Sequence, residues 1–331
     1  MDHIKVSIVT PSYNQGNFLE QTIDSVLSQN YPNLEYIIID GGSNDESVNI
    51  IKRYEKHLKY WISETDTGQS DAINKGLSHV TGDIFNWLNS DDYYEKDSLY
   101  KINDLFQNRD TKCVTGKSNL FDSKGIIRQS PGTDIYTNNL AKTIGWSRID
   151  QPETFFRMNA VQKMGLLNQK LDYLMDREWW MRYLLLFGLE SIKKTDDVLV
   201  NFRLHQDSKT VNESEGFLAE SYQLWSEITE LLSLHDLSKF FQSQTKRKEK
   251  ILDKSLYSNL ENQDIITQAA HYAMLYFADY FYYKGDHSKS KIILSMIDLQ
   301  YIQKDEQLFS KLKFRNSFPL LKSTINYFRG N

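Results

Sequence analysis

The chain has 331 residues, enough for about two domains, with the 40% apolar and 25% charged residues of a globular protein. Its net charge of −5 argues against a general nucleic-acid-binding protein. A single cysteine (Cys113), no basic and apolar leader after Met1, and no apolar run of membrane-spanning length lead us to expect a cytoplasmic protein without internal disulfides.

The N-terminal third alternates β-branched runs with amphipathic helical patterns. We expect strands at residues 5–10, 34–40, 60–63 and 83–88, and helices at 17–30, around 48–54 and within 65–82. This alternation predicts an α/β, Rossmann-like fold with a mostly parallel sheet and helices on both faces. Further along, we expect a helix at 93–108, a strand at 113–116 and a hairpin and loop within 122–139.

Polar residues follow three of the predicted strands, at Thr10–Asn14, Asp40–Ser43 and Asn89–Asp92. Because parallel strands end at one edge of a sheet, these segments should share one crevice. Tyr13 could stack on a base, Asp40 could bind a base or ribose, and Asp91 with Asp92 offers oxygen ligands for Mg²⁺ or Mn²⁺. A self-capped or solvated turn is the alternative for each acid. No dinucleotide or triphosphate loop motif occurs, so the pattern favours a nucleotide diphosphate site.

Four ordered segments resemble the bacterial family 2 glycosyltransferases of GT-A fold, and in particular those that assemble surface polysaccharides. They are Val9–Asn14, Ile39–Asp45, Trp61–Gly76 and Leu88–Asp92. The resemblance implies inverting transfer of a sugar from a nucleotide diphosphate, with UDP the commonest, to a glycan or lipid-linked acceptor. It also implies Mn²⁺ or Mg²⁺ as cofactor.

Carried over position by position, the resemblance implies a set of donor-binding residues: Thr10, Pro11, Tyr13, Asp40, Gly42, Glu64, Asp71, Lys75, Asn89, Ser90 and Arg203. It implies three metal ligands, which are Asp91, Asp92 and His205. The chain departs from the family at two positions. Asn89 replaces the first acid of the Asp-x-Asp motif, and Gly41 replaces a common second acid after Asp40.

Asp176 stands near the start of a largely apolar helix within Leu171–Tyr183. A helix N-terminus favours a carboxylate on its own account. The resemblance makes Asp176 the general base and matches Arg182 to a later arginine of the family, although Met175 replaces the family's Glu. Direct displacement needs such a group to accept the proton of the attacking hydroxyl. Glu178 is the fallback base.

Two further segments resemble the family. In Gln151–Arg157, Phe155 and Phe156 would lie under the donor sugar, and a core strand is the equal alternative. Asn201–Thr210 resembles an Arg-x-His segment, and the period of a strand places Arg203 and His205 on one face. A hydrogen-bonded structural histidine is the alternative to a metal ligand.

We expect a catalytic domain over residues 1–210, with a nucleotide-sugar half at about 1–118 and an acceptor half at about 119–210. Residues 211–331 read as a helical region, with helices at 217–232, 263–285 and 287–302. Its basic and aromatic end, 311–331, predicts a contact with the cytoplasmic membrane surface. A helical subdomain with solvated Lys and Arg is the alternative.

Two other functions remain open at this point. A sugar nucleotidyltransferase would share the sheet and the metal, but it needs a basic Gly-rich loop, and residues 10–18 contain no Lys or Arg. A nucleotide-sugar-binding protein with weak or lost catalysis is conceivable because of Asn89 and Gly41.

Overall fold

The computed structural model describes residues 3–146, 148–205, 214–245, 249–252, 257 and 262–317. The chain divides into two compact units, with unit 1 formed by residues 1–134 and 148–220 and unit 2 by 135–147 and 221–331. The division thus lies at 220, not at the expected 210. Segment 135–147, expected in the acceptor half, joins unit 2 because its helix packs closely on another helix of that unit.

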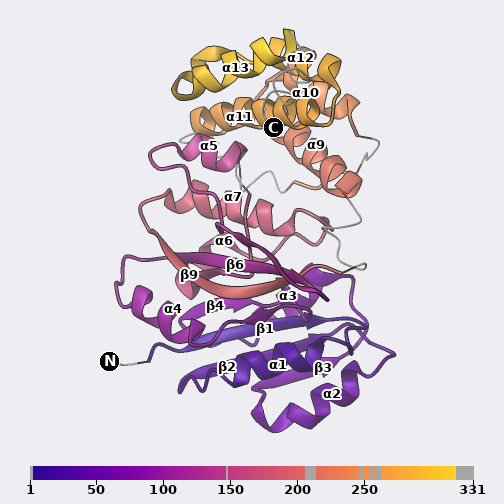
Figure 1. Cartoon of the computed structure of the whole chain (residues 1–331), viewed down its shortest axis with the longest axis vertical. Helices are drawn as coiled ribbons and strands as arrows, with labels where there is room; N and C mark the ends of the chain where they lie inside the picture. The colour runs from indigo at the N-terminus through magenta and orange to yellow at the C-terminus, as the bar shows by residue number, and fades with distance from the viewer. Residues whose placement is uncertain are drawn as a thin grey trace, which may run out of the picture. The chain divides into compact units, whose positions relative to one another are not determined.

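A mixed sheet forms the centre of unit 1, with the strand order β3-β2-β1-β4-β8-β6-β9-β5 and with β7 paired to β6 (Figure 1). The strands are β1 Val6–Ser12, β2 Leu34–Asp40, β3 Tyr60–Ser63, β4 Ile84–Trp87, β5 Tyr93–Tyr94, β6 Cys113–Asp122, β7 Gly125–Ser130, β8 Thr154–Arg157 and β9 Ile192–Arg203. The predicted strands of the N-terminal third are confirmed.

The expected parallel order holds for β1 to β4. Beyond β4 the sheet is mixed, because β8 runs antiparallel to both β4 and β6 whereas β9 runs parallel to β6. The predicted hairpin is formed by β6 and β7. The segment expected to begin a helix at 93 first forms β5, which pairs with β9.

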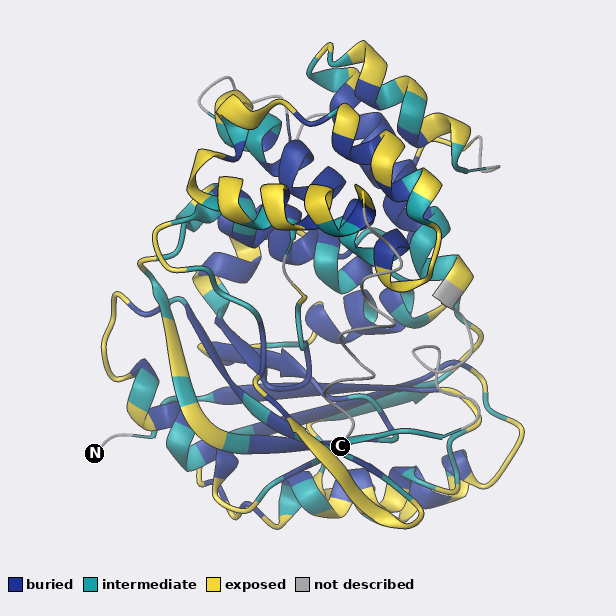
Figure 2. Ribbon diagram, turned by 45° about the horizontal axis from the view of Figure 1, so that its top comes forward, coloured by how far each residue is buried: buried dark blue, intermediate teal, exposed yellow. Residues whose placement is uncertain are grey.

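Alternate residues of the central strands face opposite helical layers, since side chains of a strand point to its two faces in turn. Val6 and Ile8 belong to a core with α1 (Leu19–Leu27), α2 (Ser47–Tyr54) and α4 (Ser98–Phe106). On the other face, α3 (Gln69–Leu77) approaches β1 so closely that a Cβ at Gly76 would meet Val9. Figure 2 shows the strands buried along most of the sheet.

Aromatic side chains hold α7 (Met175–Phe187) against that second face, together with α6 (Met158–Met164). Trp179 lies with its ring centroid 5.5 Å from that of Trp87 and 5.1 Å from that of Phe156. Such pairs add about 0.5–1.5 kcal/mol each to the burial of their area. Phe155 and Phe156 are both fully buried, and Phe155 stacks on Tyr94. The core-strand alternative therefore describes this aromatic pair, which does not face a sugar.

Unit 2 is helical, as expected. Its helices are α5 Leu140–Gly145, the later part of α9 (Ser214–Leu231), α10 His235–Ser243, α11 Gln263–Tyr283, α12 His287–Ser295 and α13 Glu306–Ser317, with short 3₁₀ turns at Leu299–Tyr301 and Gln303–Asp305. A Cβ at Gly145 would stand 2.1 Å from the carbonyl oxygen of Ala269, so only glycine lets α5 lie this close to α11. Lys142 adds a 2.6 Å ion pair with Asp305.

Among the helices in the described part of the chain, none combines the length and apolarity needed to cross a bilayer. The predicted membrane contact at 311–331 falls partly outside this part, since residues 318–331 are not among the described residues.

Candidate active site

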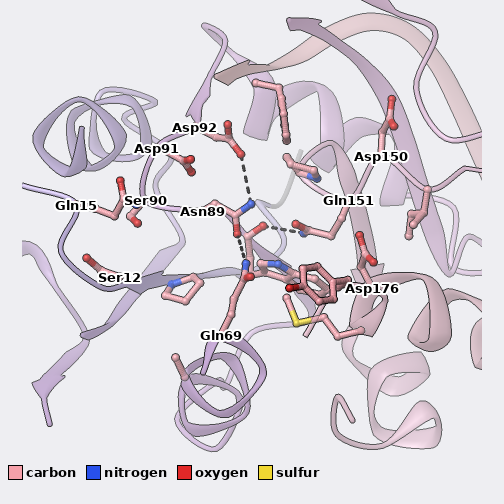
Figure 3. A pocket seen from close by; sticks show the side chains of 18 of the residues that line it. Ser12, Gln15, Gln69, Asn89, Ser90, Asp91, Asp92, Asp150, Gln151 and Asp176 are labelled. Atoms are coloured by element: carbon pink, nitrogen blue, oxygen red, sulfur yellow. Dashed lines mark hydrogen bonds between the residues drawn. The ribbon is translucent and has the colours of Figure 1, made fainter. Parts of the chain in front are cut away.

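A cavity of about 810 Å³ opens in unit 1 at the carboxyl ends of the four parallel strands. Its walls include Pro11 to Tyr13 at the end of β1, Gly41 after β2, Asp66 after β3 and Asn89 to Asp92 after β4. The structure thus brings the polar strand ends to one crevice. Figure 3 shows Asp91 and Asp92 on one side of this cavity and Asp150 and Asp176 on the other.

The acidic loop after β4 is tied to the end of β9, across 114 residues of sequence. His205 Nε2 lies 2.9 Å from Asp91 Oδ2. The backbone N–H of Arg203 donates to Asp92 at 2.9 Å, and its Nε donates to the carbonyl oxygen of Asp91 at 2.9 Å. Arg203 also stacks over the ring of Phe18, 4.7 Å from its centroid. The sequence predicts Arg203, His205 and Asp91 in one site, and the structure brings them together.

The two adjacent acids have different surroundings. Asp92 is buried, and burial raises its pKa well above the ordinary value, with the Asp91 carboxylate acting in the same direction. The side-chain amide of Asn89 donates to Asp92 at 3.4 Å and its oxygen accepts from Gln69 at 2.8 Å, as the dashed lines in Figure 3 mark. Asp92 and Asn89 therefore hold the loop in place, whereas Asp91 is partly accessible.

Asp91 and His205 are hydrogen-bonded at 2.9 Å, which is the structural alternative considered for His205. The same separation is compatible with two neighbouring ligands of an octahedral ion, which stand about 3 Å apart when each lies about 2.1 Å from it. Among the described residues no cluster of three His, Cys, Asp or Glu could hold an ion. An ion here would thus take its other ligands from phosphate and water, as Mg²⁺ commonly does.

Asp176 lies in the first turn of α7, where free backbone amides stabilise a carboxylate. The N–H of Arg177 donates to its Oδ1 at 2.6 Å. Burial nevertheless raises the pKa of Asp176 to about 6, with the Asp150 carboxylate contributing in the same direction. A carboxylate with such a pKa is ionised at neutral pH and is a stronger base than an exposed aspartate.

The fallback base does not reach the cavity. Glu178 is 1% exposed and forms a 2.7 Å ion pair with Arg182, whose other nitrogen donates to the carbonyl oxygen of Met164 at 2.6 Å. The two side chains neutralise each other in the interior, because an unpaired buried charge would be strongly destabilising. Glu178 is therefore not available as a base. This prediction for Glu178 is wrong, because a position two residues from Asp176 points to the opposite side of the helix.

The predicted donor contacts divide into two groups. Pro11, Tyr13, Asn89 and Ser90 line the cavity, and the Tyr13 ring is 61% exposed. Thr10 is buried behind them, where its hydroxyl lies 3.0 Å from Tyr36 Oη.

Asp40 is also fully buried and does not line the cavity. Its carboxylate accepts from the backbone amides of Gly42 and Ser43 at 3.2 and 2.9 Å, and from the hydroxyl of Ser63 at 2.6 Å. Gly42 has φ +83°, the left-handed conformation that this turn requires. The self-capped turn considered as the alternative describes Asp40 in this structure.

Three predicted contacts form a cluster of their own. Lys75 Nζ pairs with Glu64 at 2.9 Å and with Asp71 at 3.6 Å, and none of the three lines the cavity. Asp66, which the sequence analysis did not single out, lies near this cluster and lines the cavity. A Cβ at Gly41 would lie 2.7 Å from Asp66 Oδ2. The Asp66 carboxylate therefore occupies the space that a side chain at position 41, where the family often has a second acid, would need.

The opposite wall was also missed in part. Asp150, Gln151 and Glu153 line it from the segment before β8, and Arg128 from β7. Gln151 donates to Asn86 Oδ1 and to the carbonyl oxygen of Trp87, both at 2.8 Å. These residues could have been suspected from the sequence, because they form a polar run directly before an apolar strand, as the other strand ends do.

The sequence matches the family model described as Glycosyl transferase family 2 over residues 7–164. An uncharacterised glycosyltransferase of Rickettsia prowazekii is 30% identical over 240 residues, which is 70% of this chain and 74% of that protein. The chain belongs to glycosyltransferase family 2. Glycosyltransferase GlyA of Streptococcus pneumoniae is 34% identical over 199 residues, 52% of this chain and 29% of that protein.

The GT-A fold prediction is confirmed by solved structures. The crystal structure of S. aureus TarS 1–349 in complex with UDP matches with a TM-score of 0.55 at 17% identity, over 94% of this chain and 91% of that one. The complex of TarS 1–349 with UDP-GlcNAc matches with a TM-score of 0.53 at 15% identity, over 88% and 90%.

Proposed function

We propose that this glycosyltransferase transfers a sugar, a hexose or N-acetylhexosamine, from a nucleotide diphosphate to a hydroxyl of a glycan or lipid-linked acceptor. UDP is the favoured nucleotide. The observation that carries the proposal is one cavity lined by Asp91 on one side and by Asp176 on the other, with His205 in contact with Asp91 behind the first side. The UDP and UDP-GlcNAc complexes of TarS, which shares the fold, support a nucleotide-sugar donor.

On the metal side, Asp91 and His205 would hold Mn²⁺ or Mg²⁺ against the donor diphosphate. When bound, the ion stabilises the negative charge that develops on the leaving diphosphate. Asp92 and Asn89 keep the loop in position through their bonds to Arg203 and Gln69. Tyr13, exposed at the end of β1, offers its ring to the base.

On the base side, Asp176 accepts the proton of the acceptor hydroxyl as the oxygen attacks the anomeric carbon. Attack from the face opposite the leaving diphosphate inverts the anomeric configuration, which requires the base and the metal to lie on different sides of the sugar. The positions of Asp91 and Asp176 in Figure 3 support this arrangement. Together with the family, they favour an enzyme over a protein that only binds nucleotide sugars.

The pathway we propose is the synthesis of a surface polysaccharide or glycoconjugate, with the enzyme at the cytoplasmic face of the membrane. On α13, Lys311 and Lys313 are exposed and Phe314 is 60% exposed, which supports a surface contact. A truncation to test this should begin after Ser317, because Leu312 and Asn316 are buried within unit 2. Loss of binding to anionic vesicles is expected, and unchanged co-sedimentation would refute the contact.

The donor is tested by thermal melting with UDP, GDP or dTDP, each with Mn²⁺, Mg²⁺ or EDTA. A ligand at about 100 times its Kd stabilises the native state by roughly 2.7 kcal/mol. We expect a metal-dependent rise in Tm with one nucleotide. If no nucleotide changes Tm under any metal condition, the proposed function is wrong.

A further inference from the structure

Glu153 is a carboxyl group in the cavity wall that the transfer mechanism does not use. Its side chain is 0% exposed, and neither carboxyl oxygen has a hydrogen-bond partner in the described part of the chain. Leaving a buried polar group unpaired costs about 1–3 kcal/mol. An apolar residue at this point would avoid that cost, so the carboxyl group itself needs an explanation.

The surroundings keep this carboxyl group protonated. Burial raises the pKa of Glu153 well above its ordinary value, and the Asp150 carboxylate and, to a smaller extent, Asp92 act in the same direction. Its own backbone amide and the Ser118 hydroxyl lie near enough to act in the opposite direction, although neither makes a hydrogen bond of normal geometry to the carboxyl group. A neutral carboxyl group offers one hydrogen-bond donor and further acceptor sites.

Glu153 lines the cavity and is influenced by acids of both of its sides. Asp92, which influences it from one side, belongs to the metal loop. Asp150, which influences it from the other, also acts on Asp176. The space between a metal-bound diphosphate and a general base is the space that the sugar must occupy as it is transferred.

The backbone beside Glu153 carries no side chain at position 132. Gly132 has φ +78°, and a Cβ there would stand only 1.8 Å from the carbonyl oxygen of Gly116. The same Cβ would lie 3.8 Å from Glu153 Oε1, so a longer side chain at position 132 would contact the carboxyl group. Glycine at 132 is thus required sterically, and its consequence is that no side chain from this position covers the carboxyl group.

We propose that Glu153 binds a hydroxyl group of the transferred sugar, donating one hydrogen bond to it and accepting one from it, and so selects the sugar. A hydroxyl group matches a neutral carboxyl group because it both donates and accepts at one atom. This inference rests on the proposed transfer from a nucleotide sugar.

The test compares wild type, Glu153→Gln and Glu153→Leu by calorimetry, without acceptor. The probes are the nucleotide diphosphate that raises Tm and its commercially available hexose and N-acetylhexosamine derivatives. For Glu153→Leu we expect unchanged affinity for the nucleotide and about 10- to 100-fold weaker binding of the nucleotide sugar. Glu153→Gln, which still donates and accepts, should retain most of the affinity. Donors deoxygenated at the recognised position should bind wild type and Glu153→Leu equally.

The melting temperature of the ligand-free protein separates this role from a structural one. Glu153→Leu removes an unpaired buried polar group, so the Tm should stay equal or rise. Functional residues often lower the stability of the protein in this way. Glu227→Leu is the matched control in unit 2, because that buried carboxylate accepts from the backbone amides of Ile251 and Leu252 at 3.0 and 2.9 Å. It should lower Tm and leave donor binding unchanged.

Three results would overturn the inference: normal nucleotide-sugar binding by Glu153→Leu, equal losses for nucleotide and nucleotide sugar, or loss of folding. An effect confined to the KM of the acceptor would also overturn it, because the group would then serve the acceptor. Failure of wild type to bind any nucleotide sugar would instead refute the proposed function, so the two failures are distinguishable.

Discussion

The two sides of the cavity hold their acids in opposite ways. On the metal side, Asp91 lies against His205, and Asp92 accepts from Arg203 and Asn89. On the base side, burial raises the pKa of Asp176 to about 6, and Glu153 has no hydrogen-bond partner among the described residues. Burial raises the pKa of Asp92 and of Asp176 alike, but only the acids of the first side are bonded to another strand end, at Arg203 and His205. A metal ligand must keep its position, whereas a general base needs a pKa near the working pH, so that it is ionised and still accepts a proton readily.

Removing the base should have the largest effect on turnover. Asp176→Asn keeps the size of the side chain but cannot accept a proton, so kcat should fall by about 10²–10⁴-fold, measured as transfer of labelled sugar to acceptor. Donor affinity should stay unchanged. The variant should also melt higher than wild type at pH 7, because ionised Asp176 is disfavoured by burial in the folded state. A normal kcat would remove Asp176 as the base.

Removing the metal ligand should affect donor binding instead. Asp91→Ala leaves Asp92 and its bonds in place, so the loop should persist while the affinity for metal falls by at least about 100-fold. The check is calorimetric titration of nucleotide diphosphate with Mn²⁺ and with EDTA. Wild type should bind more tightly with Mn²⁺, and the variant should show no difference. A metal-dependent gain that survives in Asp91→Ala would contradict the assignment.

His205→Ala should have a smaller effect of the same kind. The imidazole supplies one ligand and Asp91 remains, so metal affinity should fall by about 10- to 100-fold with little change in donor affinity at saturating Mn²⁺. His79→Ala is a matched control, since His79 stacks on Tyr60 with ring centroids 3.7 Å apart and does not line the cavity. An unchanged Mn²⁺ titration for His205→Ala would make His205 a structural residue.

The site residues that could be predicted from the sequence are those whose placement follows from local pattern. Strand ends such as Asn89–Asp92 follow from local pattern, and His205 follows from its spacing to Arg203, so the sequence indicated which residues meet around Asp91. Glu178 was misjudged because the burial of its pair with Arg182, four residues on, becomes evident only when α7 packs into the interior. Phe155 and Phe156 were left undecided for the same reason.

Residues Asp150 and Glu153 were missed because their placement depends on long-range pairing. β8 pairs with β4 and β6, which lie far from it in sequence, and that pairing alone brings the preceding loop to the cavity. Their burial and mutual influence on acidity follow from the same tertiary contacts. No local pattern reports such an environment.

The pH dependence of turnover separates the two sides without any substitution. Transfer requires ionised Asp176, whose pKa is raised to about 6, so kcat should be level near pH 7.5 and fall about tenfold for each unit below pH 6. Asp176→Asn should lose this limb, and its residual rate should not change between pH 5 and 7. Saturating Mn²⁺ and donor keep metal binding from limiting the rate at low pH. If the wild-type limb instead lies near pH 4, the base is an aspartate with an ordinary pKa, and the burial of Asp176 does not set the reaction's acidity.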